Sequence, residues 1–246
     1  MKKLSFLIFI LFSITSFGQN AKEIIKKSDQ NVRGKSSIAE IKVSVIRPKW
    51  SKEMIIKSWT KGNDYAVSIL KSPKKDKGIV FLKRKKEVWN WMPSIERTIK
   101  LPPSMMMQSW MGTDLKNDDM VKQSSIVTDY NHKLVGTEIV DGLECYKLEL
   151  TAKEDASVVW GKILMWVDTK DFLQLKSEFY DEDEFLVNKI HATNIKMFGD
   201  RKLPSMIEFT TVDEPDNKTV LEYLNIVFDK DIPDAYFTTR YMKRLK

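Results

Sequence analysis

Hydrophobic and polar residues alternate along most of the chain. In the run SSIAEIKVSVIRP, apolar side chains occupy every second position from Ala39 to Val45, and polar side chains fill the positions between them. A period of two places one set on each face of an extended chain, so this run predicts a half-buried β-strand. Similar runs continue to the C-terminus, separated by turn-forming stretches such as KGND, DTKD, FGDRK and DEPDN. The pattern therefore predicts an antiparallel meander.

Only a few stretches favour helices. AKEIIKKSDQNVRG and PSMMMQSWMG are the candidates, and NDDMVKQSS predicts a short turn that Asn117 can cap. Gly112, with Thr113 and Asp114 after it, fits the end of one helix and the start of another. The fold class is thus mostly β with a few helices. So many strands form a sandwich or a strongly curved sheet, and the long strands near residues 158–197 favour the curved sheet.

The N-terminal end of the chain has the pattern of a secretory signal peptide. Lys2 and Lys3 precede the apolar run LSFLIFILFSIT, and the small residues Ser16 and Gly18 follow it. The apolar run is too short to span a bilayer by itself. We therefore expect a signal peptide over residues 1–18, one domain over residues 19–246, and export to the periplasm.

Cysteine content and charge add constraints on the exported protein. Cys145 is the only cysteine, so neither an internal disulfide nor a lipidated N-terminal cysteine is expected. The formal net charge is +7, and lysines gather in LKSPKKDKG, LKRKKE and KRLK. These lysines either protect hairpin tips and sheet edges from aggregation or steer the protein to an anionic membrane surface or an acidic partner. Export argues against nucleic acid as a partner.

Tryptophan and methionine are concentrated between Trp89 and Asp114, in WNWMPSIERTIKLPPSMMMQSWMGTD. Alternation places Trp89 and Trp91 on the same face of a strand, where they can be ordinary core. Three consecutive methionines at positions 105–107 cannot all enter one packed core. The segment therefore has two interpretations, a part of the core or the lining and lid of a pocket.

These residues carry a resemblance to a known family. The W-x-W-x-P pattern that starts at Trp89, the basic Arg97, the G-T-D at 112–114 and the acidic Asp118 and Asp119 resemble the LolA-like outer-membrane lipoprotein-sorting proteins. The N-terminal helix, the long first strand and the closing FTTRYMKRLK extend the likeness over nearly the whole mature chain.

The resemblance implies a half-barrel of about eleven antiparallel strands, covered by helices, over an apolar cavity that holds acyl chains. The best-known carrier of the wider superfamily locks its lid with an arginine, and we assign no arginine of this sequence to that role. An acyl chain gains roughly 0.8 kcal/mol per buried CH₂ group, and adaptable methionine and tryptophan side chains suit it. The residues expected to bind it are Trp59, Phe81, Trp89, Trp91, Met105, Met107, Trp110 and Met111.

We therefore expect a periplasmic carrier or chaperone for the acyl chains of lipids or lipoproteins. The alternative is a non-catalytic scaffold that senses lipids or assists a transporter. Further candidate partners are a membrane transporter, an outer-membrane acceptor and, transiently, the membrane surface. The sequence names neither the cargo nor its donor.

The sequence gives little support for a catalytic or metal-binding function. His132 and His191 are the only histidines and lie in no nucleophile or metal motif. The acidic run at 181–184 lacks the spacing and the glycine of a calcium loop, so it is expected to be a solvated hairpin tip. We expect no catalytic residue, no metal and no cofactor. An envelope hydrolase with an unusual site is the remaining alternative.

Overall fold

The computed structural model describes residues 20–117, 119, 125–156 and 158–245. The expected signal peptide at residues 1–18, Asp118 and most of the turn predicted around NDDMVKQSS lie outside these residues. No helix in the described part of the chain is long and apolar enough to cross a membrane.

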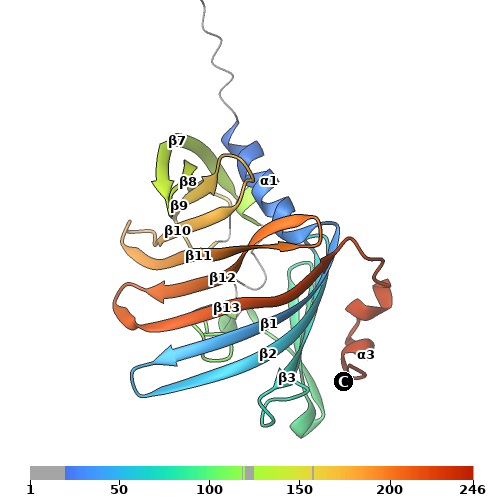
Figure 1. Ribbon diagram of the computed structural model, residues 1–246. Helices are drawn as coiled ribbons and strands as arrows, with labels where there is room; N and C mark the ends of the chain where they lie inside the picture. The colour runs from blue at the N-terminus through green and yellow to red at the C-terminus, as the bar shows by residue number, and fades with distance from the viewer. Residues whose placement is uncertain (1–19, 118, 120–124, 157, 246) are drawn as a thin grey trace, which may run out of the picture.

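A single antiparallel sheet of thirteen strands dominates the described residues. The sheet curves strongly and does not close (Figure 1). The predicted fold class is therefore confirmed, with thirteen strands where the resemblance implied about eleven. The strands are β1 (Ser36–Arg47), β2 (Trp50–Lys61), β3 (Tyr65–Ser72), β4 (Val80–Arg84), β5 (Glu87–Met92), β6 (Arg97–Lys100), β7 (Tyr130–Val140), β8 (Leu143–Ala152), β9 (Lys162–Asp168), β10 (Gln174–Tyr180), β11 (Leu186–Phe198), β12 (Arg201–Thr211) and β13 (Glu214–Phe228).

Two meanders meet in the middle of the sheet. The strands β1 to β6 follow one another to one edge, and β7 to β13 run from the other edge to the centre. The first and last strands join the two halves because β1 pairs with β13 as well as with β2. Strands from both ends of the chain thus form the middle of the curved sheet.

Helix α1 (Ala21–Arg33) confirms the one long helix that the sequence predicted. Its N-cap is Asn20, whose side chain accepts a hydrogen bond from the Lys22 amide at 3.0 Å. The apolar stripe with Ile24 and Ile25 packs against a core over β7 to β10, and the same side of the helix, continued by Ser28 and Val32, borders the hollow of the sheet. The helix therefore covers part of the concave side.

The other helical pieces are short: η1 (Pro93–Ile95), η2 (Pro103–Met105), η3 (Ser125–Val127), η4 (Asp234–Phe237) and α3 (Thr239–Met242). Of the helix predicted over PSMMMQSWMG, only the single turn η2 forms. Met111 and Gly112 both adopt positive φ, at 55° and 80°, which a right-handed helix does not allow. Residues 106–108 and 110–111 are turns and bends rather than a helix, so Gly112 ends no helix and the predicted helix end there is wrong.

The C-terminal segment, residues 232–245, covers the outer side of the sheet. Ile232, Phe237 and Met242 pack against apolar side chains of β3 and β4 that face away from the hollow. Figure 1 shows this segment in red beside β3. This segment, which includes η4 and α3, gives the convex side of β2 to β5 a core of its own.

Candidate ligand-binding cavity

The concave side of the sheet encloses a cavity of about 370 Å³. Strands β1 to β4 form one wall, β9 to β13 form the other, and α1 and a segment between β6 and β7 complete the enclosure. Most of the lining is aliphatic or aromatic. Ligand pockets in proteins occupy roughly 300–1,000 Å³ and have mostly apolar walls, so the size and lining fit a ligand site.

Residues 101–117, called here the crossing segment, pass over this cavity. Trp110 of the segment donates its backbone N–H to the carbonyl of Leu115 at 2.8 Å, and Asn117 donates to Gln108 at 3.0 Å. The positive φ angles of Met111 and Gly112 form the turn between these pairings. This small hairpin directs the Trp110 side chain at the cavity.

The Trp110 side chain is only 4% exposed. Its ring lies 5.3 Å from the ring of Phe81 on β4, edge to face at 60°. Both residues line the cavity, and they pack with Met54, Ile56 and other aliphatic side chains of β1 to β3. The indole therefore connects the crossing segment to the cavity wall through apolar contact.

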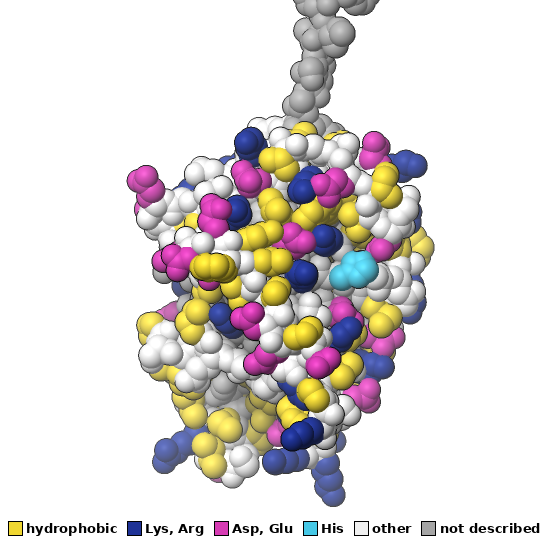
Figure 2. Space-filling view, turned by 90° about the vertical axis from the view of Figure 1, so that its left-hand side faces the viewer, with side chains coloured by type: hydrophobic (Ala, Val, Ile, Leu, Met, Phe, Trp, Pro, Cys, Tyr) yellow, Lys and Arg dark blue, Asp and Glu magenta, His cyan; other side chains and the backbone are white. Residues whose placement is uncertain are grey.

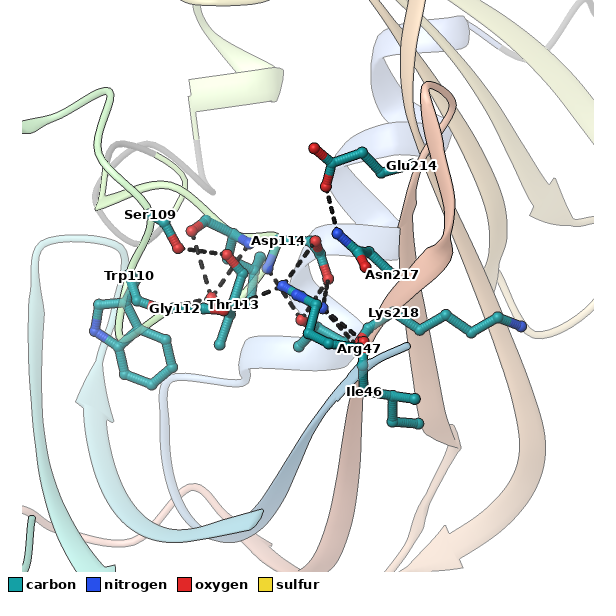
Figure 3. Close-up of polar contacts among 12 residues, drawn as sticks. Ile46, Arg47, Ser109, Trp110, Gly112, Thr113, Asp114, Glu214, Asn217 and Lys218 are labelled. Atoms are coloured by element: carbon teal, nitrogen blue, oxygen red, sulfur yellow. Dashed lines mark hydrogen bonds and ion pairs between the residues drawn. The ribbon is translucent and has the colours of Figure 1, made fainter. Parts of the chain in front are cut away.

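An ion pair fixes the crossing segment to the end of β1. Arg47 donates from Nη2 to Asp114 Oδ1 at 3.0 Å and from Nη1 to Asp114 Oδ2 at 3.2 Å, and also from Nη2 to the Gly112 carbonyl at 3.1 Å (Figure 3). Thr219 Oγ1 donates to Asp114 Oδ2 at 2.7 Å. The Arg47 and Asp114 side chains are 13% and 7% exposed. A bidentate, largely buried pair of this kind holds the segment more firmly than a surface ion pair.

The eight residues that the sequence suggested as a ligand site do not come together. Phe81 and Trp110 line the cavity. Met111 packs in the same cluster as Trp110, while Met105 is half-buried and Met107 is 52% exposed, both away from the cavity. The ligand-binding role of these residues stays a prediction.

Trp59, Trp89 and Trp91 lie on the convex face, in the cluster that the C-terminal segment covers. Trp59 has its ring 6.0 Å from Tyr236, and Lys243 lies 5.4 Å from the Trp91 ring. The register explains this placement, because Trp89 and Trp91 pair with β4 residues that point away from the cavity. As the alternation predicted, these two tryptophans share one face.

Sequence reasoning missed Arg47 and left Asp114 without a role. Arg47 stands in IRPKW at the end of a predicted strand, and its partner is 67 positions away. Neither residue type nor spacing links the two. Lys83 was also missed, although its place two residues after Phe81 puts it on the same strand face.

His132, His191 and Cys145 lie outside the cavity and contact other groups of the protein. Burial is the main cause that lowers the pKa of His132, whose Nε2 lies 2.6 Å from the Ile126 carbonyl oxygen. His191 pairs with Asp141 at 2.7 Å on the surface. Burial also raises the pKa of Cys145 to about 11. Within the described residues no three His, Cys, Asp or Glu side chains gather as metal ligands would.

Surface charges of both signs are interspersed on the face that holds several hairpin tips. Figure 2 shows basic and acidic side chains mixed with apolar ones over this face, without a large patch of one sign. On the convex side of the sheet, charged side chains pair across neighbouring strands, such as Lys42 with Glu222 at 2.9 Å and Lys218 with Glu208 at 3.1 Å.

The chain was compared with protein families and with curated proteins. A family model described only as "Uncharacterized protein" matches residues 62–244. A search of curated proteins finds no match.

Three solved structures are similar over nearly the whole chain. A DUF1329 family protein from Desulfovibrio piger is 24% identical, with a TM-score of 0.82 and coverage of 90% of this chain and 97% of that one. A LolA superfamily protein from Nitrosomonas europaea is 25% identical, with a TM-score of 0.75 and coverage of 90% and 98%. A candidate outer membrane lipoprotein-sorting protein domain from Vibrio parahaemolyticus is 20% identical, with a TM-score of 0.79 and coverage of 91% and 98%.

Proposed function

Because the chain belongs to the protein family whose model it matches over residues 62–244 and has the LolA-like fold, we propose that it is a carrier or chaperone that holds acyl chains of lipids or lipoproteins. The proposal includes export to the periplasm, removal of residues 1–18 and action of residues 19–246 as one binding unit. It assigns no catalytic step, no metal and no cofactor to the protein.

The observation that carries the proposal is the partly open apolar cavity on the concave side of the sheet. An acyl chain is flexible and has no polar group of its own, so a site for it needs apolar area rather than directed hydrogen bonds. The lining supplies that area through Ile41, Ile56, Phe81 and Trp110 on one wall and through residues such as Met165 and Ile207 on the other.

The crossing segment supports exchange of cargo. It reaches the cavity through Trp110 and is held at its far end by the pair of Arg47 with Asp114. Breaking that pair would remove one attachment of the segment, which the Thr219 hydrogen bonds and the packing of Trp110 also hold. A carrier needs such a segment, because its cargo must enter and leave while the fold persists.

Native mass spectrometry tests the proposal. The full chain, expressed with its own N-terminal segment and purified gently from the periplasm, is expected to carry a lipid or an acylated peptide that solvent extraction identifies. A ligand-free mass, together with no uptake from mixed phospholipid vesicles, contradicts a carrier. A stable protein partner in place of lipid would support the scaffold alternative.

A further inference from the structure

Two lysines of the described residues line the apolar cavity without an ion-pair partner, and of these Lys189 is exposed whereas Lys83 is not. Lys83 lies on the concave face of β4, two positions from Phe81, and is half-buried. Among the described residues it has neither a hydrogen bond nor an ion pair. A desolvated ammonium group without a partner is costly, and such groups tend to serve a ligand.

The charged groups around Lys83 do not neutralise it. Arg33 and Asp29 of α1 line the cavity near it, and they pair with each other at 2.6 Å. Asp64, on the turn before β3, is exposed to solvent. Burial is the main cause that lowers the pKa of Lys83 to about 8; Arg33 lowers it further, and the two carboxylates oppose the shift. Arg33 and Asp29 thus pair with each other, Asp64 is solvated, and Lys83 has no direct ion-pair partner at this end of the cavity.

The cavity wall becomes less polar with distance from Lys83. Cross-strand pairing from β1 to β4 defines rows of side chains on the concave face, and successive rows step along the strands. The first row has two hydroxyls and the ammonium, the second has two hydroxyls and a phenyl ring, and the third is entirely aliphatic. The rows are Ser37, Thr60, Ala66 and Lys83; then Ala39, Ser58, Ser68 and Phe81; then Ile41, Ile56 and Leu70.

This gradient matches the shape of an amphiphile. We propose that the row with Lys83, Ser37 and Thr60 binds the anionic head group of the ligand, a carboxylate or a phosphate, while the acyl chain extends over the aliphatic row toward Trp110. The ammonium gives a charge-assisted hydrogen bond. The Ser37 and Thr60 hydroxyls bond each other at 2.7 Å, which leaves one O–H of the pair to donate to the ligand. The inference rests on the proposed function and specifies the class of its ligand.

Two probes with the same tail separate the head-group site from the acyl site. cis-Parinaric acid carries a carboxylate, and its methyl ester carries the same fluorescent chain without charge. The full chain is expected to bind both, and to prefer the acid by about tenfold at pH 7, because a charge-assisted bond at this end is lost with the ester.

Matched variants test whether the preference for the acid over the ester depends on Lys83. Lys83→Met is expected to remove the preference for the acid and to leave ester binding unchanged, and Lys83→Arg is expected to retain it. Lys86→Met is the control, since Lys86 lies exposed on the turn of the same β4–β5 hairpin and its loss changes the net charge equally. If Lys83→Met binds the acid as tightly as the unchanged protein does, the head-group site is overturned.

The outcomes distinguish the two proposals. If neither probe binds, the proposed function itself fails. If both probes bind with equal affinity, only the head-group site fails. Inorganic phosphate at millimolar concentration is expected to leave the bound acid in place, because the site needs the tail. Displacement of the acid by free phosphate would mean that the site binds a free anion, and would overturn the assignment to an amphiphile.

Discussion

Aromatic residues lie on both faces of the sheet between β2 and β5, but on one face they form core and on the other they border a cavity. On the convex face, Trp59, Trp89 and Trp91 are covered by the C-terminal segment. On the concave face, Phe81 and Trp110 border a cavity of about 370 Å³. Aromatic content alone therefore does not mark the ligand side of this sheet.

The difference lies in what covers each face. The C-terminal segment fills the convex side with Ile232, Phe237 and Met242, whose exposures are 2%, 2% and 0%. On the concave side α1 and the crossing segment close over the sheet without filling the hollow. A filled face contributes stability, whereas an unfilled face gives up part of the packing energy and keeps room for a ligand.

The largest expected effect is on the stability of the convex face. Phe237→Ala should lower the free energy of unfolding by about 3–5 kcal/mol, because a fully buried ring leaves a cavity in the core. Urea denaturation measures this free energy of unfolding. Phe185→Ala, at a side chain that is 69% exposed, serves as the control and should change stability by at most about 0.5 kcal/mol. Binding of parinaric acid by the folded fraction should not change. A folded Phe237→Ala protein that no longer binds the probe would remove the division of roles between the faces.

The next effect concerns the attachment of the crossing segment. Asp114→Ala should lower the free energy of local opening by about 2–3 kcal/mol, because Arg47 then stays largely buried without its partner. Amide hydrogen exchange at Trp110 and Asn117, whose N–H groups bond within the segment, reports this opening.

Arg47→Met in the Asp114→Ala background is the matched control for this pair. The double variant should open less easily than the sum of the two single changes predicts, since no unpaired charge remains. Faster exchange throughout the sheet, rather than in the segment alone, would show that the pair supports the whole fold.

A pair of tryptophan substitutions compares the two faces directly. Trp110→Ala should weaken parinaric acid binding by about tenfold or more, since roughly 1.4 kcal/mol of apolar contact with the chain corresponds to tenfold. Trp91→Ala removes an equal side chain from the convex face and should leave the affinity of the folded protein unchanged. Fluorescence titration measures both. Equal losses in the two variants would mean that the concave cavity is not the site.

The smallest expected effect is a dependence on pH. The Lys83 pKa of about 8 means that the free protein carries this charge below pH 8 and loses it above. Affinity for parinaric acid should therefore fall as pH rises from 7 to 9, by about tenfold at most, since a bound anion favours the charged amine. The other charged groups that act on Lys83 are Arg33, Asp29 and Asp64.

The methyl ester is the control for the pH experiment, because its affinity has no reason to change over the same interval. Acid and ester that weaken in parallel would assign the pH effect to the protein as a whole rather than to Lys83.

Alternation along the chain predicted most of the fold. It gave the strands and the shared face of Trp89 and Trp91, and the stretch 21–34 without alternation gave the helix, because local backbone geometry fixes these features. It did not show which face is concave. That choice depends on the curvature of the whole sheet and on where residues 232–245 pack, which are contacts between distant parts of the chain.

The site was less predictable than the fold. Phe81 and Trp110 were expected and lie at the cavity, but Arg47 and Asp114 are joined across 67 positions by a contact that no local pattern encodes. Lys83 differs, since its spacing of two from Phe81 already placed a cation on the same face. A polar residue in phase with the apolar face of a strand was the signal available in the sequence.

Photoaffinity labelling tests the central claim most directly. A fatty acid with a diazirine along its tail is bound to the full chain, activated by light, and mapped by peptide mass spectrometry. The account predicts adducts on concave residues such as Ile41, Ile56, Phe81 and Trp110, and their loss when unlabelled fatty acid competes. Adducts confined to the convex face around Trp59 and Trp91, or scattered over the surface without competition, would contradict it.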